Sequence, residues 1–284
     1  MTRTFSLVSA QSTDIGNVAV QQDDALIVNS VFGPELCDLY AVFDGHGSYG
    51  NLCSRFVKNT LAQLITTHKQ ALNQNIEKAI TQLFHIANEL LDEESAIDNY
   101  ISGSTAVLVL VLNNQLVVAN LGDSRAVLAR DTEQGLKAVP LTEDHTCENP
   151  AELERVKSCG ARVEQLQIGN EFCGPLRIFK GSLPYPGLAM TRAFGDSSAR
   201  KLGVLCQPDI KIYDVQPEDK FLILATDGVW QGVTNQEAVE LVNQYGPSQA
   251  QEATTHLTNF SLEAQRKADF DDNTTNICVF FKRS

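Results

Sequence analysis

Basic residues are in short supply in this sequence. Lys and Arg total 22 against 35 Asp and Glu, which leaves a formal net charge of −13 and a pI near 4.8. Nucleic acids and anionic membranes are bound through basic surface, so neither is expected to be the main partner. The excess acid has two explanations: it keeps the protein soluble, or some of the carboxylates gather to hold cations.

Long apolar runs and paired metal-binding motifs are also missing. The longest clean apolar run, residues 105–112, is too short to cross a bilayer, and the first residues lack the apolar core of a signal peptide. The seven cysteines form no CxxC pair, and the five histidines never stand three or four residues apart. These spacings argue against a disulfide framework and a zinc motif. We therefore expect a cytoplasmic or nuclear protein with reduced thiols.

The sequence contains no internal repeat, low-complexity tract or long linker, so residues 1–284 are interpreted as one domain. Periodicity predicts strands and helices in runs. The expected strands are residues 5–8, 25–32, 39–43, 104–112, 115–120, 125–129, 210–215, 221–225 and 276–281. Two expected helices are recognised by their apolar stripes. The first stripe is Tyr49, Leu52, Phe56, Leu61 and Leu64, and the second is Leu72, Ile76, Ile80, Leu83, Ala87 and Leu91. Further helices are expected at 149–160, 235–245 and 248–267. Residues 165–187 are rich in Gly and Pro and are expected to form an irregular flap.

Because strands come in runs and helices in pairs, the order favours an α+β layered fold over strict βαβ alternation. Helix pairs are expected to flank a largely antiparallel sheet system. Asn113-Asn114 predicts a tight hairpin. Asn149-Pro150 predicts a capped helix start with Glu152 as the capping-box partner.

Several aspartates share one kind of position, the end of an apolar strand. They are Asp23 and Asp24 before one strand, Asp44, Asp123 and Asp227 after others, and Asp272 just before the last. Short side chains at strand ends can be aimed rigidly at one point, and converging Asp oxygens without His or Cys suit a hard cation such as Mg²⁺ or Mn²⁺. At any single position, Asp-Gly after a strand is equally well explained as ordinary turn chemistry.

Eight segments along the chain resemble, in order, the metal-dependent Ser/Thr protein phosphatases of type 2C. They are QQDD at 21–24, VFDGHG at 42–47, SGSTA at 102–106, NLGDSRA at 120–126, LTEDH at 141–145, PGLAMTRAFGD at 186–196, ATDGVW at 225–230 and DDNTT at 271–275. Each segment alone is weak evidence. The eight in the family's order are specific, and they cover essentially the whole chain.

The resemblance implies a central β-sandwich of two mostly antiparallel sheets flanked by pairs of antiparallel helices, in four layers α-β-β-α, with a two-metal site at one end. The ligands carried over are Asp44, which would bridge both metals, and the Gly45 carbonyl; Asp227 and Asp272 for one metal; Asp23, with Asp24 in support, for the other; and Asp123 for a third, weaker metal.

The implied reaction is hydrolysis of phosphoserine and phosphothreonine in proteins, by direct attack of a hydroxide that bridges two Mg²⁺ or Mn²⁺ ions. His46, two residues after Asp44, stands where the family has the general acid that protonates the departing Ser or Thr oxygen. No covalent phosphoenzyme is required. The resemblance implies phosphorylated proteins as substrates, and we expect the chain to be a monomer.

Four positions depart from the family pattern. A phosphate-gripping Arg is replaced by Ala19, the common Glu by Asp23, a Gly by Ser48 and an acid by Gln231. We hypothesise that Ala19 raises KM, so that Ala19→Arg lowers it, and that Gln231 weakens the third metal. These departures leave open a second function, that of a catalytically weak or inactive relative which binds phosphoproteins as a regulatory module. A metal-dependent nuclease is disfavoured by the acidic charge.

Other prominent residues are interpreted as structural. Asp144-His145 is expected to position a loop, and Trp230 is expected in the core. For Arg192, support of the metal carboxylates and a plain scaffold salt bridge remain equal alternatives. Specificity for the substrate is expected to lie in the flap.

Overall fold

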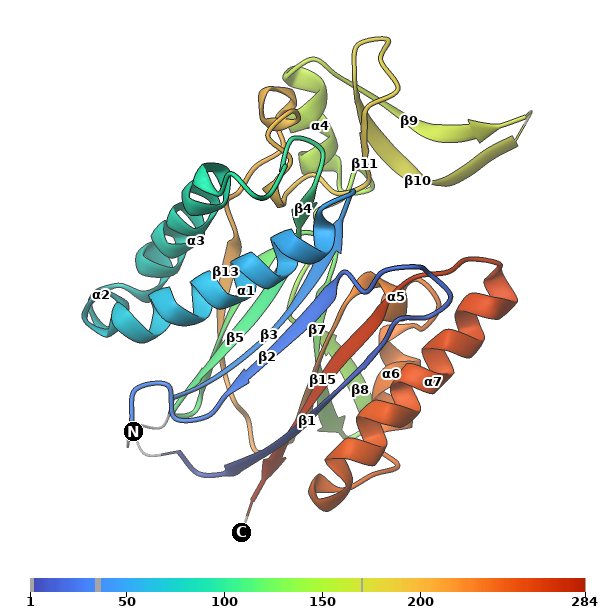
Figure 1. Ribbon diagram of the computed structural model, residues 1–284. Helices are drawn as coiled ribbons and strands as arrows, with labels where there is room; N and C mark the ends of the chain where they lie inside the picture. The colour runs from blue at the N-terminus through green and yellow to red at the C-terminus, as the bar shows by residue number, and fades with distance from the viewer. Residues whose placement is uncertain (1–2, 34–36, 170, 284) are drawn as a thin grey trace.

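The computed structural model describes residues 3–33, 37–169 and 171–283, and two antiparallel sheets stacked face to face form its centre (Figure 1). The first sheet has the order β1 (Ser6–Asp14), β15 (Thr274–Lys282), β14 (Asp219–Ala225), β7 (Arg125–Thr132) and β8 (Gly135–Pro140). The second has the order β12 (Phe194–Gly195), β4 (Gly103–Ser104), β3 (Cys37–His46), β5 (Ala106–Leu112), β6 (Gln115–Leu121) and β13 (Asp209–Asp214), with β2 (Asp23–Val28) paired with β3.

Helices cover the outer face of each sheet. The second sheet is covered by α1 (Gly50–Thr67), α2 (Lys69–Gln74) and α3 (Ile76–Glu93), and the first by α6 (Asn235–Val242) and α7 (Ala250–Ala268). Shorter elements are α4 (Pro150–Ser158), α5 (Asp227–Trp230) and two 3₁₀ turns at Arg200–Leu202 and Pro247–Gln249. The predicted α+β fold with four layers α-β-β-α is confirmed. Within the described residues, no helix has the length and apolar character that a bilayer crossing requires.

The central strands are apolar throughout because both of their faces are covered. In β5, Leu108 and Leu110 pack toward α1 and α3, whereas Val107 and Val109 pack between the two sheets. Successive side chains of a strand point to opposite faces, so a strand inside a four-layer fold buries every residue. Each such side chain stabilises the fold by about 1.5–3 kcal/mol. These layers hold the strand ends in place, and the site lies there.

The apolar stripe predicted for the first helix is partly wrong. Tyr49 and Leu52 are exposed, and the buried stripe is Cys53, Val57, Leu61 and Ile65. The first turn of α1 lies against β3 through Gly50, where a side chain would collide with the backbone of Gly45, so no large residue can face inward there. The second stripe is confirmed, although Asn75 divides its helix into α2 and α3 and caps α3 by accepting from the Lys78 amide.

The irregular flap predicted at 165–187 is also wrong. β9 (Ala161–Ile168) and β10 (Glu171–Lys180) form a hairpin, and β11 (Pro186–Leu188) pairs with β10. The Gly174-Pro175 pair, which suggested irregular structure, lies where the register shifts between Cys173 and Arg177. Residue 170, within the predicted flap, lies outside the described residues. In Figure 1 the hairpin projects beyond the sandwich, and its base packs with α4.

Local signals are mostly confirmed. Asn113, in the left-handed region with φ 53°, makes the turn between β5 and β6, and Asn149 caps α4 by accepting from the Ala151 amide. The predicted capping box is wrong, because the buried Glu152 carboxylate accepts from Arg155 and Arg192. β8 was not predicted; it is a short, only partly buried strand at the sheet edge.

Candidate active site

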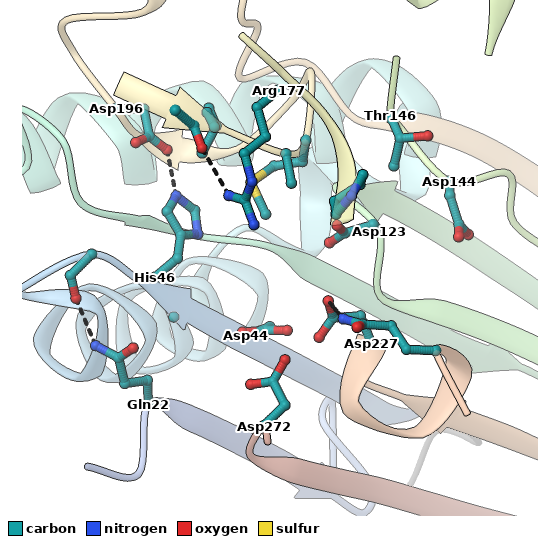
Figure 2. A pocket seen from close by; sticks show the side chains of 18 of the residues that line it. Gln22, Asp44, His46, Asp123, Asp144, Thr146, Arg177, Asp196, Asp227 and Asp272 are labelled. Atoms are coloured by element: carbon teal, nitrogen blue, oxygen red, sulfur yellow. Dashed lines mark hydrogen bonds and ion pairs between the residues drawn. The ribbon is translucent and has the colours of Figure 1, made fainter. Parts of the chain in front are cut away.

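A pocket of about 680 Å³ opens at one end of the sandwich, beneath the flap hairpin. Most of the predicted site residues line it: Asp44, Gly45, His46, Asp123, Asp227 and Asp272. Figure 2 shows their side chains facing one space, with Asp44, Asp227 and Asp272 grouped at its floor. The structure thus brings together residues that the sequence separates by more than two hundred positions.

The strand ends of the two sheets meet under this floor. Asp23 and Asp44 face each other in the register of β2 and β3. Thr226, at the end of β14, donates its hydroxyl to Asp23 Oδ2 at 2.7 Å and its amide to the Thr275 carbonyl at 3.0 Å. Asp227 then opens α5 directly above this junction. Asp23 is therefore buried just behind the pocket floor, held by a hydroxyl from the other sheet.

The glycines that follow Asp44 and Asp227 are required for close packing. A side chain on Gly45 would collide with the Gly50 carbonyl, and one on Gly228 with the Asn273 carbonyl. Neither glycine has a positive φ, so the Asp-Gly pairs do not serve the left-handed turn that usually selects glycine. The simple turn explanation is thus wrong at both positions, and the glycines let backbones approach around the site.

Asp24, predicted to support the site, lies elsewhere. It follows Asp23 in β2, so its side chain points to the opposite face of the sheet. There Asp24 Oδ2 pairs with Lys58 Nζ of α1 at 2.6 Å. Adjacent position in the sequence suggested a shared role, but the strand's alternation separates the two carboxylates.

Burial without compensating charge dominates the electrostatics of the pocket. Burial, followed by repulsion from Asp227, raises the pKa of Asp123 and of Asp272 to about 8. Burial also raises the pKa of Asp23 to about 7. Asp44 is buried and surrounded by Asp227, Asp23 and Asp272, which raise its pKa well above the ordinary value. Such carboxylates are ready to exchange protons for a divalent cation.

The donor set fits a hard cation, because the pocket gathers carboxylates. In the described part of the chain, no group of three or more His, Cys, Asp or Glu side chains is already arranged to hold a metal ion. The pocket nevertheless offers oxygen donors, and Asp123 Oδ1 is buried without a hydrogen-bond partner. Like-charged carboxylates repel each other in the absence of a cation. A divalent cation bound among them would relieve this repulsion.

His46 is held by a residue that the sequence did not single out. Its Nε2 lies 2.6 Å from Asp196 Oδ2, while its Nδ1 is buried without a partner. Burial disfavours the charged ring, but the charge and hydrogen bond of Asp196 outweigh it, so the pKa of His46 is raised. Asp196, with φ 43°, ends the PGLAMTRAFGD segment, which is the one signal that could have identified it.

The residues interpreted as structural are confirmed in that role. Asp144 accepts two hydrogen bonds from Arg125, at 3.0 and 2.7 Å, and the guanidinium of Arg125 lies over the Trp230 ring. His145 Nδ1 accepts from the Gly122 amide at 3.1 Å. Trp230 is buried and donates from Nε1 to a backbone carbonyl.

Arg192 is a scaffold residue. It bonds Glu152, at 2.8 Å from Nη2, and Asp209, at 2.6 Å from Nη1, and it does not line the pocket. The alternative in which it supports the metal carboxylates is therefore wrong.

The departures from the family pattern are also visible. Gln231 stands where the family has an acid. Its side-chain amide donates a hydrogen bond to Asp227 Oδ2 and so occupies that carboxylate oxygen. Ala19 is exposed in a shallow hollow that adjoins the pocket and shares Gln22 and Asp272 with it. Sequence reasoning missed Arg177, which reaches the pocket from β10.

Comparison with known proteins agrees with this geometry. The protein phosphatase 2C family model matches residues 11–269. Probable protein phosphatase 2C 72 of Arabidopsis thaliana is 36% identical over 293 residues, covering 99% of this chain and 86% of that protein. Probable protein phosphatase 2C 35 of the same plant is 34% identical, with 93% and 79% covered. The crystal structure of serine-threonine phosphatase 2C from Toxoplasma gondii superimposes with a TM-score of 0.83 at 26% identity, covering 99% of this chain and 98% of the other. The chain therefore belongs to the protein phosphatase 2C family of metal-dependent serine/threonine phosphatases.

Proposed function

We propose that the chain hydrolyses phosphoserine and phosphothreonine in proteins with two Mg²⁺ or Mn²⁺ ions, and that a third binds weakly at Asp123. The observation that carries this proposal is the convergence of Asp44, Asp227 and Asp272 on the pocket whose wall holds His46. A decayed regulatory module would have no need to keep all of them, so this alternative is not favoured. The acidic charge supports a role away from nucleic acid and membranes, and the cysteine spacing supports action on cytoplasmic or nuclear phosphoproteins; we propose that the chain acts as a monomer.

The chain's own residues provide binding and proton transfer. Asp44, Asp227 and Asp272 would hold one cation, and Asp44 and Asp23 the other, with Asp23 behind the floor. When bound, the cations make hydroxide available at neutral pH and neutralise phosphate charge. Asp196 fixes the His46 ring through Nε2, so the Nδ1 atom, which has no protein partner, carries the proton for the leaving Ser or Thr oxygen.

Phosphate release from a phosphothreonine peptide tests the activity. We expect release with Mn²⁺ or Mg²⁺, none with a chelator, and none in Asp227→Asn with either metal. If the wild type releases no phosphate with any metal yet still binds the phosphopeptide, the regulatory module is the correct function.

The role of His46 is tested by changing the leaving group. In His46→Gln, kcat for the phosphothreonine peptide should fall about 10²-fold or more, because an alkoxide needs a proton. Hydrolysis of p-nitrophenyl phosphate should fall far less, since nitrophenolate leaves unprotonated. Equal losses on the two substrates would show that His46 is not the acid.

The third ion is tested at Gln231. Because its amide occupies Asp227 Oδ2, Gln231→Asp should both free that oxygen and add a carboxylate beside it. The variant should reach full activity at lower Mn²⁺ concentration than the wild type. Superimposable Mn²⁺ curves would count against a third ion near Asp227.

A further inference from the structure

Two arginines line the pocket within the described residues, and they differ in how they are engaged. Arg125 is fully occupied: Nε and Nη2 bind Asp144, Nη1 binds Asn235 at 2.6 Å, and its face covers Trp230. Arg125 therefore has no edge left for a ligand.

Arg177 is only partly engaged. Its Nη1 donates to the Gly187 carbonyl at 2.8 Å, its Nε is buried without a hydrogen-bond partner, and its Nη2 bonds no described residue. A buried donor without a partner costs about 1–3 kcal/mol. The unmet Nε is thus a cost to the folded protein that a ligand oxygen would remove.

The position of Arg177 is rigid. Ile178 and Phe179, the next residues of β10, are buried at the base of the hairpin, and β10 pairs with both β9 and β11. The Gly187 carbonyl holds one edge of the guanidinium. Figure 2 shows this group reaching from the flap side into the pocket, between the side chains of His46 and Asp123 and above Asp44.

We propose that Arg177 binds the phosphate group of the substrate and takes over the role of the arginine that Ala19 replaces. This inference rests on the proposed function. A guanidinium binds phosphate through two parallel N–H donors, and the Nε–Nη2 edge of Arg177 is the one that protein groups leave open. The phosphate is then gripped from the flap, and not from the segment between β1 and β2 that carries Ala19.

Kinetics and phosphate binding test the proposal together. Arg177→Ala should raise KM for a phosphothreonine peptide, and the dissociation constant of inorganic phosphate measured with Mn²⁺ present, at least about tenfold, or about 1.4 kcal/mol. Arg177→Lys keeps the positive charge but loses the two parallel N–H donors. Its KM and phosphate dissociation constant should therefore lie between those of the wild type and Arg177→Ala. The matched control is Lys180→Ala, which removes one charge from an exposed position on the same strand and should change both values less than twofold.

A second variant tests the exchange of roles. Ala19→Arg should lower KM much more in the Arg177→Ala background than in the wild type, because in the wild type the phosphate already has its arginine. Equal gains in the two backgrounds would show that the residues act independently and would overturn the exchange.

The outcomes separate this inference from the proposed function. An active wild type with unchanged KM and phosphate affinity in Arg177→Ala overturns the inference alone. An inactive wild type overturns the proposed function, and the phosphate dissociation constant still decides whether Arg177 binds the anion. Thermal unfolding and Mn²⁺ binding measured by calorimetry should match the wild type, and a folded Arg177→Lys supplies the result if Arg177→Ala fails to fold.

Discussion

Two groups of acids in this molecule have opposite electrostatics. At the base of the flap, Glu152 accepts from Arg155, Arg192 and Thr191, and these hydrogen bonds outweigh its burial and lower its pKa. The hydrogen bond from His145 and the charge of Arg192 likewise lower the pKa of Asp209 to about 2.

In the pocket, acids of the same kind have raised pKa values. Burial acts on them as it does on Glu152, but no guanidinium pairs with Asp44, Asp123 or Asp272 among the described residues. At the flap base the protein supplies its own cation, an arginine side chain. In the pocket it leaves that position for a cation from solution. A fixed arginine in the pocket floor would compete with a divalent ion, whereas at the flap base it locks the scaffold.

The largest expected effect is the loss of activity when a pocket aspartate, and not one outside the pocket, is neutralised. Asp44→Asn keeps the size of the side chain but removes its charge, so phosphatase activity should fall about 10³-fold or more, or about 4 kcal/mol. Asp24→Asn is the matched control, since Asp24 pairs with Lys58 on the other face of β2. Its kcat/KM, measured with Mn²⁺ and a phosphothreonine peptide, should stay within about threefold. A comparable loss in both variants would contradict the division between the two faces.

The second-largest expected effect is on the stability of the protein and not on its activity. Glu152→Gln removes the buried charge that pairs with Arg155 and Arg192, leaves Arg192 with Asp209 alone, and should lower the free energy of unfolding by about 3 kcal/mol. The control is Glu164→Gln, since Glu164 is exposed on the flap where it pairs with Arg162, and its cost should be under about 1 kcal/mol. Denaturant unfolding measures both. Equal costs would mean that the Glu152 network is no more than a surface pair.

The extent to which the sequence predicted these two groups follows from their geometry. Asp44, Asp227 and Asp272 lie at strand ends within short segments that resemble the family's motifs, and the two signals together were enough to predict them. Asp196 touches His46 across 150 residues, and this contact depends on how the sheets and flap pack. No local pattern encodes it.

The same reason explains the other errors. Asp24 was grouped with Asp23 because they are neighbours in sequence, but a strand sends neighbours to opposite faces. Glu152 had the spacing of a capping box, but hydrogen bonds from Arg155, Arg192 and Thr191 outweighed one local hydrogen bond. The flap hairpin was missed because Gly174 and Pro175, which resemble a loop in sequence, mark a bulge in paired strands. Central strands were predicted well, since burial on both faces leaves an apolar signature.

The smallest effect tests the pocket acids without mutation. In the folded protein, the pKa of Asp123 and of Asp272 is raised from 3.8 to about 8. Such a carboxyl group favours folding in full only at pH values below its pKa in the unfolded chain. As pH rises from about 4 to about 8, these carboxyl groups ionise in the unfolded chain but stay protonated in the folded chain. The metal-free protein should therefore lose stability across this range, by at least about 1.4 kcal/mol, the free energy of one pKa unit.

Mn²⁺ should reverse this loss, because a bound cation allows the aspartates to ionise in the folded state. The increase in Tm caused by Mn²⁺ should then be larger at pH 8 than at pH 5.5, when measured on chelator-treated protein. Glu152 works in the opposite direction: its lowered pKa stabilises the fold above about pH 4.5, so its contribution is constant between these two pH values. An equal increase in Tm at both pH values would show that the pocket acids are already ionised without metal, and the contrast between the two groups would fail.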